Sequence, residues 1–400
     1  MNKRDFLLHN ALCPLPWTGI YVNPDGAIKN CAISKTTLGN IHETALGDIL
    51  TGDTNIMIRQ DMLSSDRHAR CQACYRVEDN AGNRHQNESN RTWYKKLAIR
   101  HHQDLEIFDH TDQFLPTVLD LRWRNTCNRA CIYCGPDLSS LWQDMMDMEY
   151  KIDESVLERS KNYIFQNLST VKHVYLAGGE PLVIKENQAL LERLLEVNPD
   201  VEIRINSNIG NINTPVFRLL ERFSNVRWTI SVDSMGQSFE YMRWPGRWDE
   251  FVINLKTIQG QVGDRISFNM VWCILNDRDI LSTVDFLIDQ GFHENMFIVQ
   301  CLTYPRPLSV INLPETVRDQ LKNSLLQRRA QADNSYWLYK SLSSMYNFLN
   351  DPKIDDGPNM FFDRISLESG LAGTVKFLQA IDAMRGTNSR DIFPRLYQYQ

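Results

Sequence analysis

NTCNRACIYC, residues 125–134, follows a run at 117–123 whose residues are typical of a β-strand. The stretch carries three cysteines, Cys127, Cys131 and Cys134, on what we expect to be a short loop. Three closely spaced thiolates can ligate three irons of a cubane iron–sulfur cluster, and the fourth iron is then left without a protein ligand. An iron with an open position can bind a small chelating molecule.

Other interpretations of these three thiols stay open on spacing alone. A zinc site would need a fourth ligand, usually a nearby His or Cys, and neither occurs close to the stretch. A disulfide arrangement is disfavoured because three thiols cannot all pair among themselves. The three cysteines could also share a loop by chance.

The spacing Cys127-x3-Cys131-x2-Cys134, with Tyr133 just before the last cysteine, resembles the signature of the radical S-adenosylmethionine (SAM) enzymes. That resemblance implies a [4Fe-4S] cluster held by the three cysteines, whose open iron chelates SAM.

Two further motifs follow in the order of that family. GGEP, residues 178–181, comes after a strand-like run and resembles the family's methionine-binding motif. SVD, residues 231–233, ends another strand-like run at the place where the family contacts SAM. The resemblance extends from about residue 116 to residue 313.

The resemblance also implies which residues contact SAM. They come from the cysteine loop, the glycine-rich turn, the ends of two strands and an arginine beyond them. These residues are Tyr133, Gly178, Gly179, Glu180, Pro181, Asn206, Asn208, Ser231, Asp233 and Arg243.

Charged residues alternate with apolar ones in two of the expected strands. Because successive side chains of a strand point to opposite faces, we expect Asp120, Arg122 and Arg204 to face the interior of the sheet's curve. They are weak catalytic candidates. The structural alternative is that they pair with one another, since a charge that is buried alone is costly.

Six strand-like runs alternate with six helix-like runs after residue 116, which predicts a parallel sheet with helices outside. The fold class is α/β, and six repeats predict an open, partial (β/α)6 barrel, as the resemblance also implies. The expected strands are 117–123, 172–177, 201–206, 226–232, 266–273 and 296–302, and the expected helices are 136–147, 153–168, 184–197, 213–223, 248–261 and 278–290. Active sites of such folds lie at the carboxyl ends of the strands, where the three motifs fall.

A second group of cysteines precedes the barrel. NPDG, residues 23–26, predicts a β-hairpin, and Cys13, Cys31, Cys71 and Cys74 lie around it and after a helical stretch at 45–62. Four thiols can make a closed zinc site or fully ligate a cubane cluster.

The spacing of this second group resembles the auxiliary-cluster module called SPASM, or its shorter twitch form. Only four thiols are present, so the resemblance implies one auxiliary [4Fe-4S] cluster and favours the twitch form. The module usually follows the SAM-binding domain, whereas here it comes first. Because four protein thiolates leave no vacant iron, we expect an electron relay or a structural role.

The remaining sequence predicts three segments. Residues 1–115 form the auxiliary module and a helical connector, 116–313 the barrel, and 314–400 a C-terminal helical extension with helices at 314–332, 335–349 and 371–384. The extension carries no recognisable chemistry, and we expect it to cap the barrel.

The bulk composition limits the classes of partner. The chain has 400 residues, 42% of them hydrophobic, and a formal net charge of −6 with both signs mixed. That charge pattern does not indicate the basic patch that binds nucleic acid. No stretch is apolar enough for a signal peptide or a membrane span. We therefore expect a cytoplasmic protein, where grouped cysteines indicate metal rather than disulfides.

The resemblance implies radical chemistry. An external electron donor of the flavodoxin or ferredoxin type would reduce the cluster, SAM would be cleaved to a 5′-deoxyadenosyl radical, and that radical would abstract hydrogen from a substrate C–H bond. A peptide or amino-acid residue is the favoured substrate. The alternatives are a small molecule such as a sugar, nucleoside or amino acid, and, from another class, a non-catalytic binding protein stabilised by metal.

Overall fold

The computed structural model describes most of the chain and divides it into two compact units. The described residues are 2–23, 25–34, 37–79, 89–101, 105–148, 153–333, 336–352 and 368–398. The first unit comprises Met1–Arg124, Lys151–Ile205 and Pro215–Val226, and the second comprises Asn125–Tyr150, Asn206–Thr214 and Arg227–Gln400.

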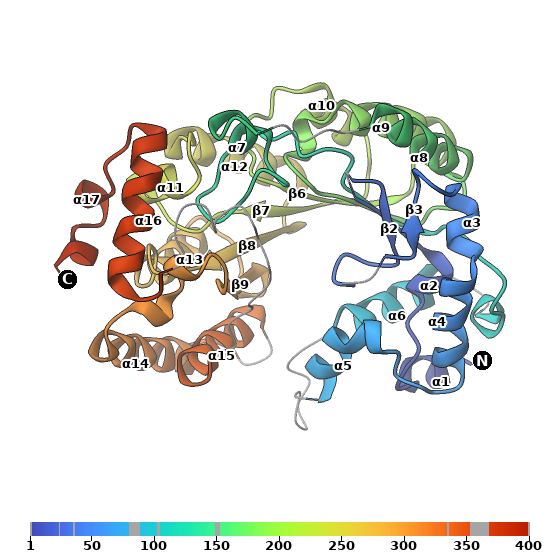
Figure 1. Cartoon of the computed structure of the whole chain (residues 1–400), viewed down its shortest axis with the longest axis horizontal. Helices are drawn as coiled ribbons and strands as arrows, with labels where there is room; N and C mark the ends of the chain where they lie inside the picture. The colour runs from blue at the N-terminus through green and yellow to red at the C-terminus, as the bar shows by residue number, and fades with distance from the viewer. Residues whose placement is uncertain are drawn as a thin grey trace. The chain divides into compact units, whose positions relative to one another are not determined.

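The first unit contains a sheet with helices on both sides (Figure 1). Its strands are β1 (Gly19–Val22), β2 (Ala27–Lys29), β3 (Gly39–Asn40), β4 (Val118–Leu121), β5 (His173–Leu176) and β6 (Glu202–Ser207, whose last two residues belong to the second unit). Its helices are α1 (Lys3–Leu8), α2 (Leu15–Thr18), α3 (Leu46–Thr51), α4 (Asp53–Leu63), α5 (Gln72–Asp79), α6 (Asn90–His101), α8 (Glu154–Gln166), α9 (Lys185–Val197) and α10 (Pro215–Leu220). The strand order is β3-β2-β1-β4-β5-β6.

The predicted hairpin is present and does more than predicted. Strands β1 and β2 pair antiparallel across the turn, where Gly26 takes a φ of 79°, a conformation that favours glycine. Pro24, the other turn residue on which the prediction depended, lies outside the described residues. Strand β1 also pairs parallel with β4, with Gly19 opposite Val118. The cysteine module therefore extends the parallel sheet, which the sequence pattern did not indicate.

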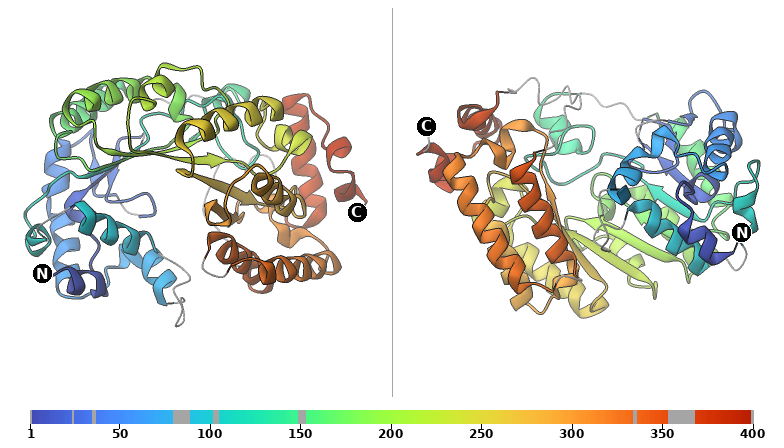
Figure 2. Two further views of the ribbon diagram at one scale, coloured as in Figure 1. Left: turned by 180° about the vertical axis from the view of Figure 1, so that it is seen from behind. Right: turned by 90° about the horizontal axis from the view of Figure 1, so that it is seen from below.

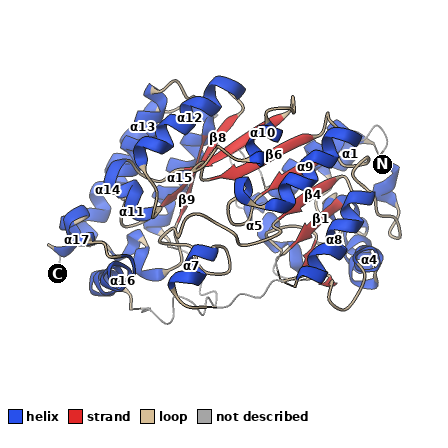
Figure 3. Cartoon of the chain, turned by 90° about the horizontal axis from the view of Figure 1, so that it is seen from above, coloured by secondary structure: helices blue, strands red, loops and turns tan. Residues whose placement is uncertain are grey.

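The two faces of this sheet differ in chemistry. Ile20, Leu119, Val174 and Ile203 lie side by side on one face and are buried. Helices α8 and α9 lie on the outer side of these strands (Figure 3). The opposite face carries the polar residues of the same strands, as alternation requires.

The second unit contains parallel strands and the C-terminal helices. Its strands are β7 (Val226–Ser231, whose first residue belongs to the first unit), β8 (Ile266–Trp272) and β9 (Phe297–Cys301), paired in that order. Its helices are α7 (Ser140–Met145), α11 (Gly236–Met242), α12 (Trp248–Val262), α13 (Asp279–Asp289), α14 (Glu315–Gln331), α15 (Trp337–Asn350), α16 (Gly370–Arg385) and α17 (Ser389–Ile392). Helices α14 and α15 run side by side, as the orange-brown pair in Figure 2 shows.

Helix α15 covers the last strand. The Ser341 hydroxyl oxygen accepts a hydrogen bond from the Val299 backbone N–H at 3.0 Å. A serine on the helix thus satisfies one donor of the β9 edge, which would otherwise need water or another strand.

The expected open α/β architecture is confirmed, and so is each expected strand and helix of the barrel repeat. Two local expectations were wrong. The single helix expected at 45–62 is broken at Gly52 into α3 and α4, and α11 was not expected. The expected boundaries at 115/116 and 313/314 stay predictions. Among the described residues, no helix is long and apolar enough to cross a membrane.

Candidate functional site

Hydrogen bonds fix the backbone of the three-cysteine loop in the second unit. The Ala130 and Ile132 N–H groups donate to the carbonyls of Trp244 and Met242 at 2.7 and 2.8 Å. The indole N–H of Trp142 donates to the Cys131 carbonyl at 2.9 Å. The loop is therefore an ordered element rather than a loose connection, as a rigid metal site requires.

The three thiols face one another closely enough to interact. Burial raises the pKa of the Cys134 thiol well above its usual value, and the neighbouring Cys131 and Cys127 raise it further. Two donors approach the sulfurs. Arg243 Nη1 lies 3.9 Å from Cys131 Sγ, and Asn208 Nδ2 lies 3.9 Å from Cys127 Sγ. Because such donors stabilise thiolates, the residues present fit a cluster held by three cysteines.

A buried carboxylate organises the residues beside the loop. Asp233 is 1% exposed, accepts from the Tyr133 hydroxyl and from the Val271 N–H at 2.7 Å, and pairs with Arg243 Nε at 2.8 Å. Burial alone would lower the pKa of Arg243, but Asp233 raises it above its usual value. Asp233 thus orients Tyr133 and Arg243, two of the predicted SAM contacts.

The other polar residues predicted in this unit also gather at the strand ends. The Ser231 hydroxyl donates to Asn206 Oδ1 at 3.4 Å, and Asn208 Nδ2 donates to Asn128 Oδ1 at 2.9 Å. The structure therefore brings Asn208 to the cysteine loop and joins Asn206 to Ser231 across two strands.

The glycine-rich turn belongs to the first unit. Gly178 has a φ of 111°, and a Cβ there would lie 3.2 Å from the Arg124 carbonyl oxygen. Only glycine fits this close approach without strain. Glu180 is buried, and its Oε1 accepts from the Leu182 N–H at 3.1 Å, at the start of a 3-10 turn that begins with Pro181. Gly179 donates to the Arg124 carbonyl at 3.4 Å.

The three weak catalytic candidates lie on the polar face of the first unit's sheet. Asp120 and Arg122 form an ion pair at 3.1 Å. Burial raises the pKa of Asp120 against the opposing effect of Arg122. Arg204 lies in register with Tyr175 on the adjacent strand. The pair between Asp120 and Arg122 is the arrangement that the structural alternative anticipated.

Two tyrosines belong to the same row and were missed. Strand register places Tyr21, Asp120 and Tyr175 side by side. The Arg122 guanidinium lies 5.3 Å from the centre of the Tyr21 ring and 6.0 Å from that of Tyr175. Alternation within each strand could have indicated both tyrosines, but the pairing of β1 with β4 was needed to align them. We call Tyr21, Asp120, Arg122, Tyr175 and Arg204 the polar row.

The four N-terminal cysteines line one small cavity in the first unit, with a volume of about 30 Å³. Burial raises the pKa of Cys71 to about 12, with further contributions from Cys31 and Cys74. Within the described ranges, no group of three His, Cys, Asp or Glu residues is close enough for a single ion. A cubane separates its ligands more widely than one ion does, so a shared, thiol-lined cavity fits a cluster better than zinc.

Two basic residues from α6 hold the backbone just before Cys13. Arg91 donates to the carbonyls of His9 and Leu12 at 2.9 and 3.0 Å and pairs with Glu78. Lys95 donates to the Leu7 carbonyl at 3.2 Å. The sequence predicted a helical connector in this region, and the burial of Arg91 and Lys95 was not part of that prediction.

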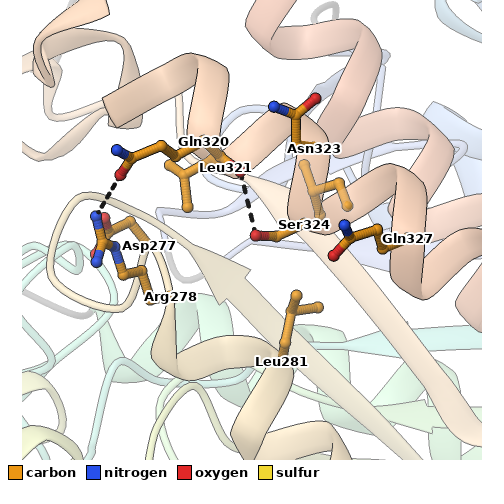
Figure 4. A pocket seen from close by; sticks show the side chains of 9 residues that line it. Asp277, Arg278, Leu281, Gln320, Leu321, Asn323, Ser324 and Gln327 are labelled. Carbon is orange, nitrogen blue, oxygen red and sulfur yellow. Dashed lines mark hydrogen bonds between the residues drawn. The ribbon is translucent and has the colours of Figure 1, made fainter. Parts of the chain in front are cut away.

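One further hollow lies in the second unit, between the start of α13 and α14, with a volume of about 450 Å³. Figure 4 shows amide side chains around it, and Arg278 donates to Gln320 at 3.0 Å. None of the predicted cluster or SAM residues lines it.

The comparisons with known proteins agree with this arrangement. A sequence model described as the radical SAM superfamily matches residues 123–287. A model described as the iron–sulfur cluster-binding SPASM domain matches residues 13–75. The match to SPASM confirms both the predicted module and its position before the barrel.

Two similar curated proteins are GTP 3′,8-cyclases. That of Ectopseudomonas mendocina (strain ymp) is 23% identical over 60% of this chain and 75% of its own length. That of Nautilia profundicola is 26% identical over 41% of this chain and 50% of its own length.

Among solved structures, two similar ones contain SAM or a peptide. The first is anSMEcpe with bound AdoMet and the Cp18Cys peptide, which has a TM-score of 0.39 and 14% identity and covers 54% of this chain and 60% of that one. The second is Streptococcus suis SuiB bound to the precursor peptide SuiA, which has a TM-score of 0.38 and 15% identity and covers 69% of this chain and 60% of that one.

Radical SAM enzymes use SAM and a [4Fe-4S] cluster, and a SPASM domain holds a further iron–sulfur cluster. On these two family matches, the chain belongs to the radical SAM superfamily of enzymes and carries a SPASM cluster-binding domain before its radical SAM domain.

Proposed function

We propose that this enzyme abstracts hydrogen from a C–H bond of a peptide or amino-acid residue. When bound, the loop cluster and SAM supply a 5′-deoxyadenosyl radical, made by one-electron cleavage of the sulfonium. The observation that carries the proposal is the three-thiol loop, where Arg243 and Asn208 approach the sulfurs.

The residues of the second unit would hold the loop's cluster and SAM. Cys127, Cys131 and Cys134 would ligate three irons, while Tyr133 and Arg243, both oriented by Asp233, would face SAM. Arginine suits the SAM carboxylate because its planar donors match two oxygens. Asn206, Asn208 and Ser231 would add hydrogen bonds. For Gly178, Gly179, Glu180 and Pro181, which belong to the first unit, contact with SAM stays a prediction from the sequence.

The polar row would bind the substrate. It combines two aromatic rings with three charges, of which Asp120 and Arg204 lie on strands and Arg122 lies just after β4. Burial and next the nearby Asp120 carboxylate raise the pKa of Tyr94, which places Tyr94 close to the row. Tyr94 also lines the four-thiol cavity. A substrate on the row would therefore sit near the auxiliary cluster of the same unit.

The auxiliary cluster would relay electrons or stabilise the module. Four protein thiolates leave no iron free for a substrate. The loop cluster would need an external donor of the flavodoxin or ferredoxin type. The cytoplasm is the proposed location because thiolate ligands persist in a reducing compartment. Segments 1–115, 116–313 and 314–400 remain the proposed domains.

A small anionic molecule is the second candidate substrate. Arg122 and Arg204 outnumber Asp120 in the polar row, and both similar curated proteins are named for a nucleotide substrate. The superfamily match favours an enzyme over a metal-stabilised binding protein.

The test uses substrates labelled with deuterium. The anaerobically reconstituted enzyme, SAM and dithionite are mixed with a peptide fraction or a nucleotide fraction from cells grown in deuterated medium. We expect deuterium in the 5′-deoxyadenosine formed with the peptide fraction. Label that comes only from the nucleotide fraction would support the second candidate, and a complete lack of 5′-deoxyadenosine would contradict both.

A further inference from the structure

The C-terminal helix α16 ends at an arginine that reaches the cysteine loop. Arg385 is buried and is the last residue of the helix, and Gly386 follows with a φ of 65°. Glycine at this position ends a helix without strain. The end of α16 is therefore a defined structural point, from which the Arg385 side chain extends.

The Arg385 guanidinium binds two backbone carbonyls from distant parts of the sequence. Nη1 donates to the Tyr241 carbonyl at 2.9 Å, and Nη2 donates to the Ala130 carbonyl. Ala130 lies directly before the ligand Cys131. The Ala130 N–H meanwhile donates to the Trp244 carbonyl at 2.7 Å. The peptide groups on both sides of this loop residue are thus held.

Aromatic rings enclose the guanidinium. Its central carbon lies 5.0 Å from the centre of the Trp142 ring and 5.7 Å from that of Trp244. Trp142 also donates to the Cys131 carbonyl at 2.9 Å. Arg385 and Trp142 therefore stack on each other and hold two successive carbonyls of the loop.

The turn after α16 keeps this arginine in place. Asp382 accepts hydrogen bonds from the Tyr241 hydroxyl at 3.0 Å and from the Ser389 N–H and hydroxyl at 2.8 and 2.6 Å. The Asp382 carboxylate thus uses its hydrogen bonds to hold the turn after α16 against Tyr241. Among the described residues, Arg385 has no carboxylate at ion-pair distance, and Asp382 acts on its charge only from further away.

A buried cation without a carboxylate partner is costly, so its position needs a reason beyond packing. The loop gains negative charge when its thiols become cluster ligands. A positive charge beside Cys131 would offset that charge, and it would stabilise the reduced cluster more than the oxidised one.

We propose that Arg385 is a positioning residue for the loop cluster, through which the C-terminal extension holds the Ala130 and Cys131 peptides and offsets the charge of the loaded loop. This inference rests on the proposed cluster at Cys127, Cys131 and Cys134. It gives the extension a function that its sequence did not reveal.

The test compares Arg385→Gln and Arg385→Lys with Arg390→Gln in the full chain. Arg390 is a matched control because it lies in the same extension, is exposed and stacks on Tyr397. Each protein is reconstituted anaerobically, and its iron content, its paramagnetic resonance spectrum after reduction with and without SAM, and the midpoint potential of the loop cluster are measured. The SAM-dependent spectral change reports the loop cluster, because the auxiliary cluster has no open iron.

We expect Arg385→Gln to lose most of the SAM-dependent signal, or to keep it with a midpoint potential that is more negative than in the wild type. The auxiliary signal should be unchanged. Arg385→Lys should recover part of the effect, since an ammonium keeps the charge but lacks the planar fork. Arg390→Gln should match the wild type.

Wild-type iron content, signal and potential in Arg385→Gln would overturn the inference. If that variant does not fold, the test uses Trp142→Phe and Arg385→Lys. Trp142→Phe removes the donor to the Cys131 carbonyl and reduces the ring that packs on the guanidinium. An unchanged signal and potential in both would equally overturn it. A wild-type protein without any SAM-dependent signal would refute the proposed function instead, and this result is recognisable before any variant is made.

Discussion

The two thiol sites of this enzyme have different surroundings. In the first unit, four cysteines line one cavity together with apolar and aromatic residues such as Leu15 and Tyr94 and with the polar Arg70, Asn90 and Arg91. In the second, three cysteines share a loop where Arg243 and Asn208 each place a donor 3.9 Å from a sulfur. A cluster whose four irons are all ligated by the protein needs a cavity lined by its cysteines. A cluster with an open iron also needs polar residues for the molecule that completes the coordination of that iron.

The two sites nevertheless share one structural arrangement. In each, a buried cation from a distant helix binds backbone carbonyls beside a ligating cysteine. Arg91 of α6 binds the Leu12 carbonyl before Cys13, and Arg385 of α16 binds the Ala130 carbonyl before Cys131. Cation and helix lie in the same unit as their cysteines, so each site can be perturbed separately.

The largest expected effect comes from removing the open-iron site. Replacing Cys127, Cys131 and Cys134 with Ala should abolish SAM cleavage and leave about four of roughly eight irons per chain, because a cubane holds four. Iron assay and 5′-deoxyadenosine formation with dithionite measure the two quantities. Cleavage of SAM at the wild-type rate in this variant would show that the loop does not hold the open-iron cluster, and the two thiol sites would then not differ in the way proposed.

The matched variant removes ligands from the four-thiol site of the first unit. Replacing Cys71 and Cys74 with Ala should lose a similar share of iron but keep SAM cleavage without substrate. A loss of cleavage while the SAM-dependent spectrum persists would mean that the four-thiol site also supports the radical step.

A smaller effect is expected from Arg91→Gln, which breaks a buried ion pair with Glu78 and removes the donors to His9 and Leu12. Removing one partner of such a pair costs about 3 kcal/mol. Denaturant unfolding of the holoenzyme should show this loss, together with loss of auxiliary iron. Arg67→Gln is a suitable control because it breaks an exposed pair with Asp79 on the neighbouring α5. Loss of the loop cluster instead would contradict the separation of the two sites.

The sequence predicted what depends on local pattern. Cysteine spacing, strand alternation and the glycine turn at Gly178 all act within a few residues. The structure has the expected strands and a positive φ at Gly178, while the roles of these residues stay predictions. The polar row and Arg385 could not be predicted in this way. Tyr21 joins the row only because β1 pairs with β4, and Arg385 meets Ala130 across a long sequence separation. Nothing near either residue signals its partner.

The smallest expected effect is a difference in pH dependence between the charge of Lys95 in the first unit and that of Arg385 in the second. Lys95, beside Arg91, is 1% exposed. Burial, and next the charge of Arg91, lowers the pKa of Lys95 to about 7, while Cys13 and Glu78 oppose the shift. Burial lowers the pKa of Arg385 only to about 10. As the pH rises through about 7, the cationic charge should therefore be lost at Lys95 but kept at Arg385.

The sign of the stability change follows from proton binding. Between about pH 7 and pH 10 the unfolded chain keeps the Lys95 proton that the folded protein has lost, so the free energy of unfolding rises with pH. The slope is at most about 1.4 kcal/mol per pH unit. Denaturant unfolding of wild type and Lys95→Met from pH 6 to pH 9 measures it, and the wild type should gain stability relative to the variant. Parallel pH curves for the two proteins would show that Lys95 keeps its proton, and the two sites would then carry equally permanent charges.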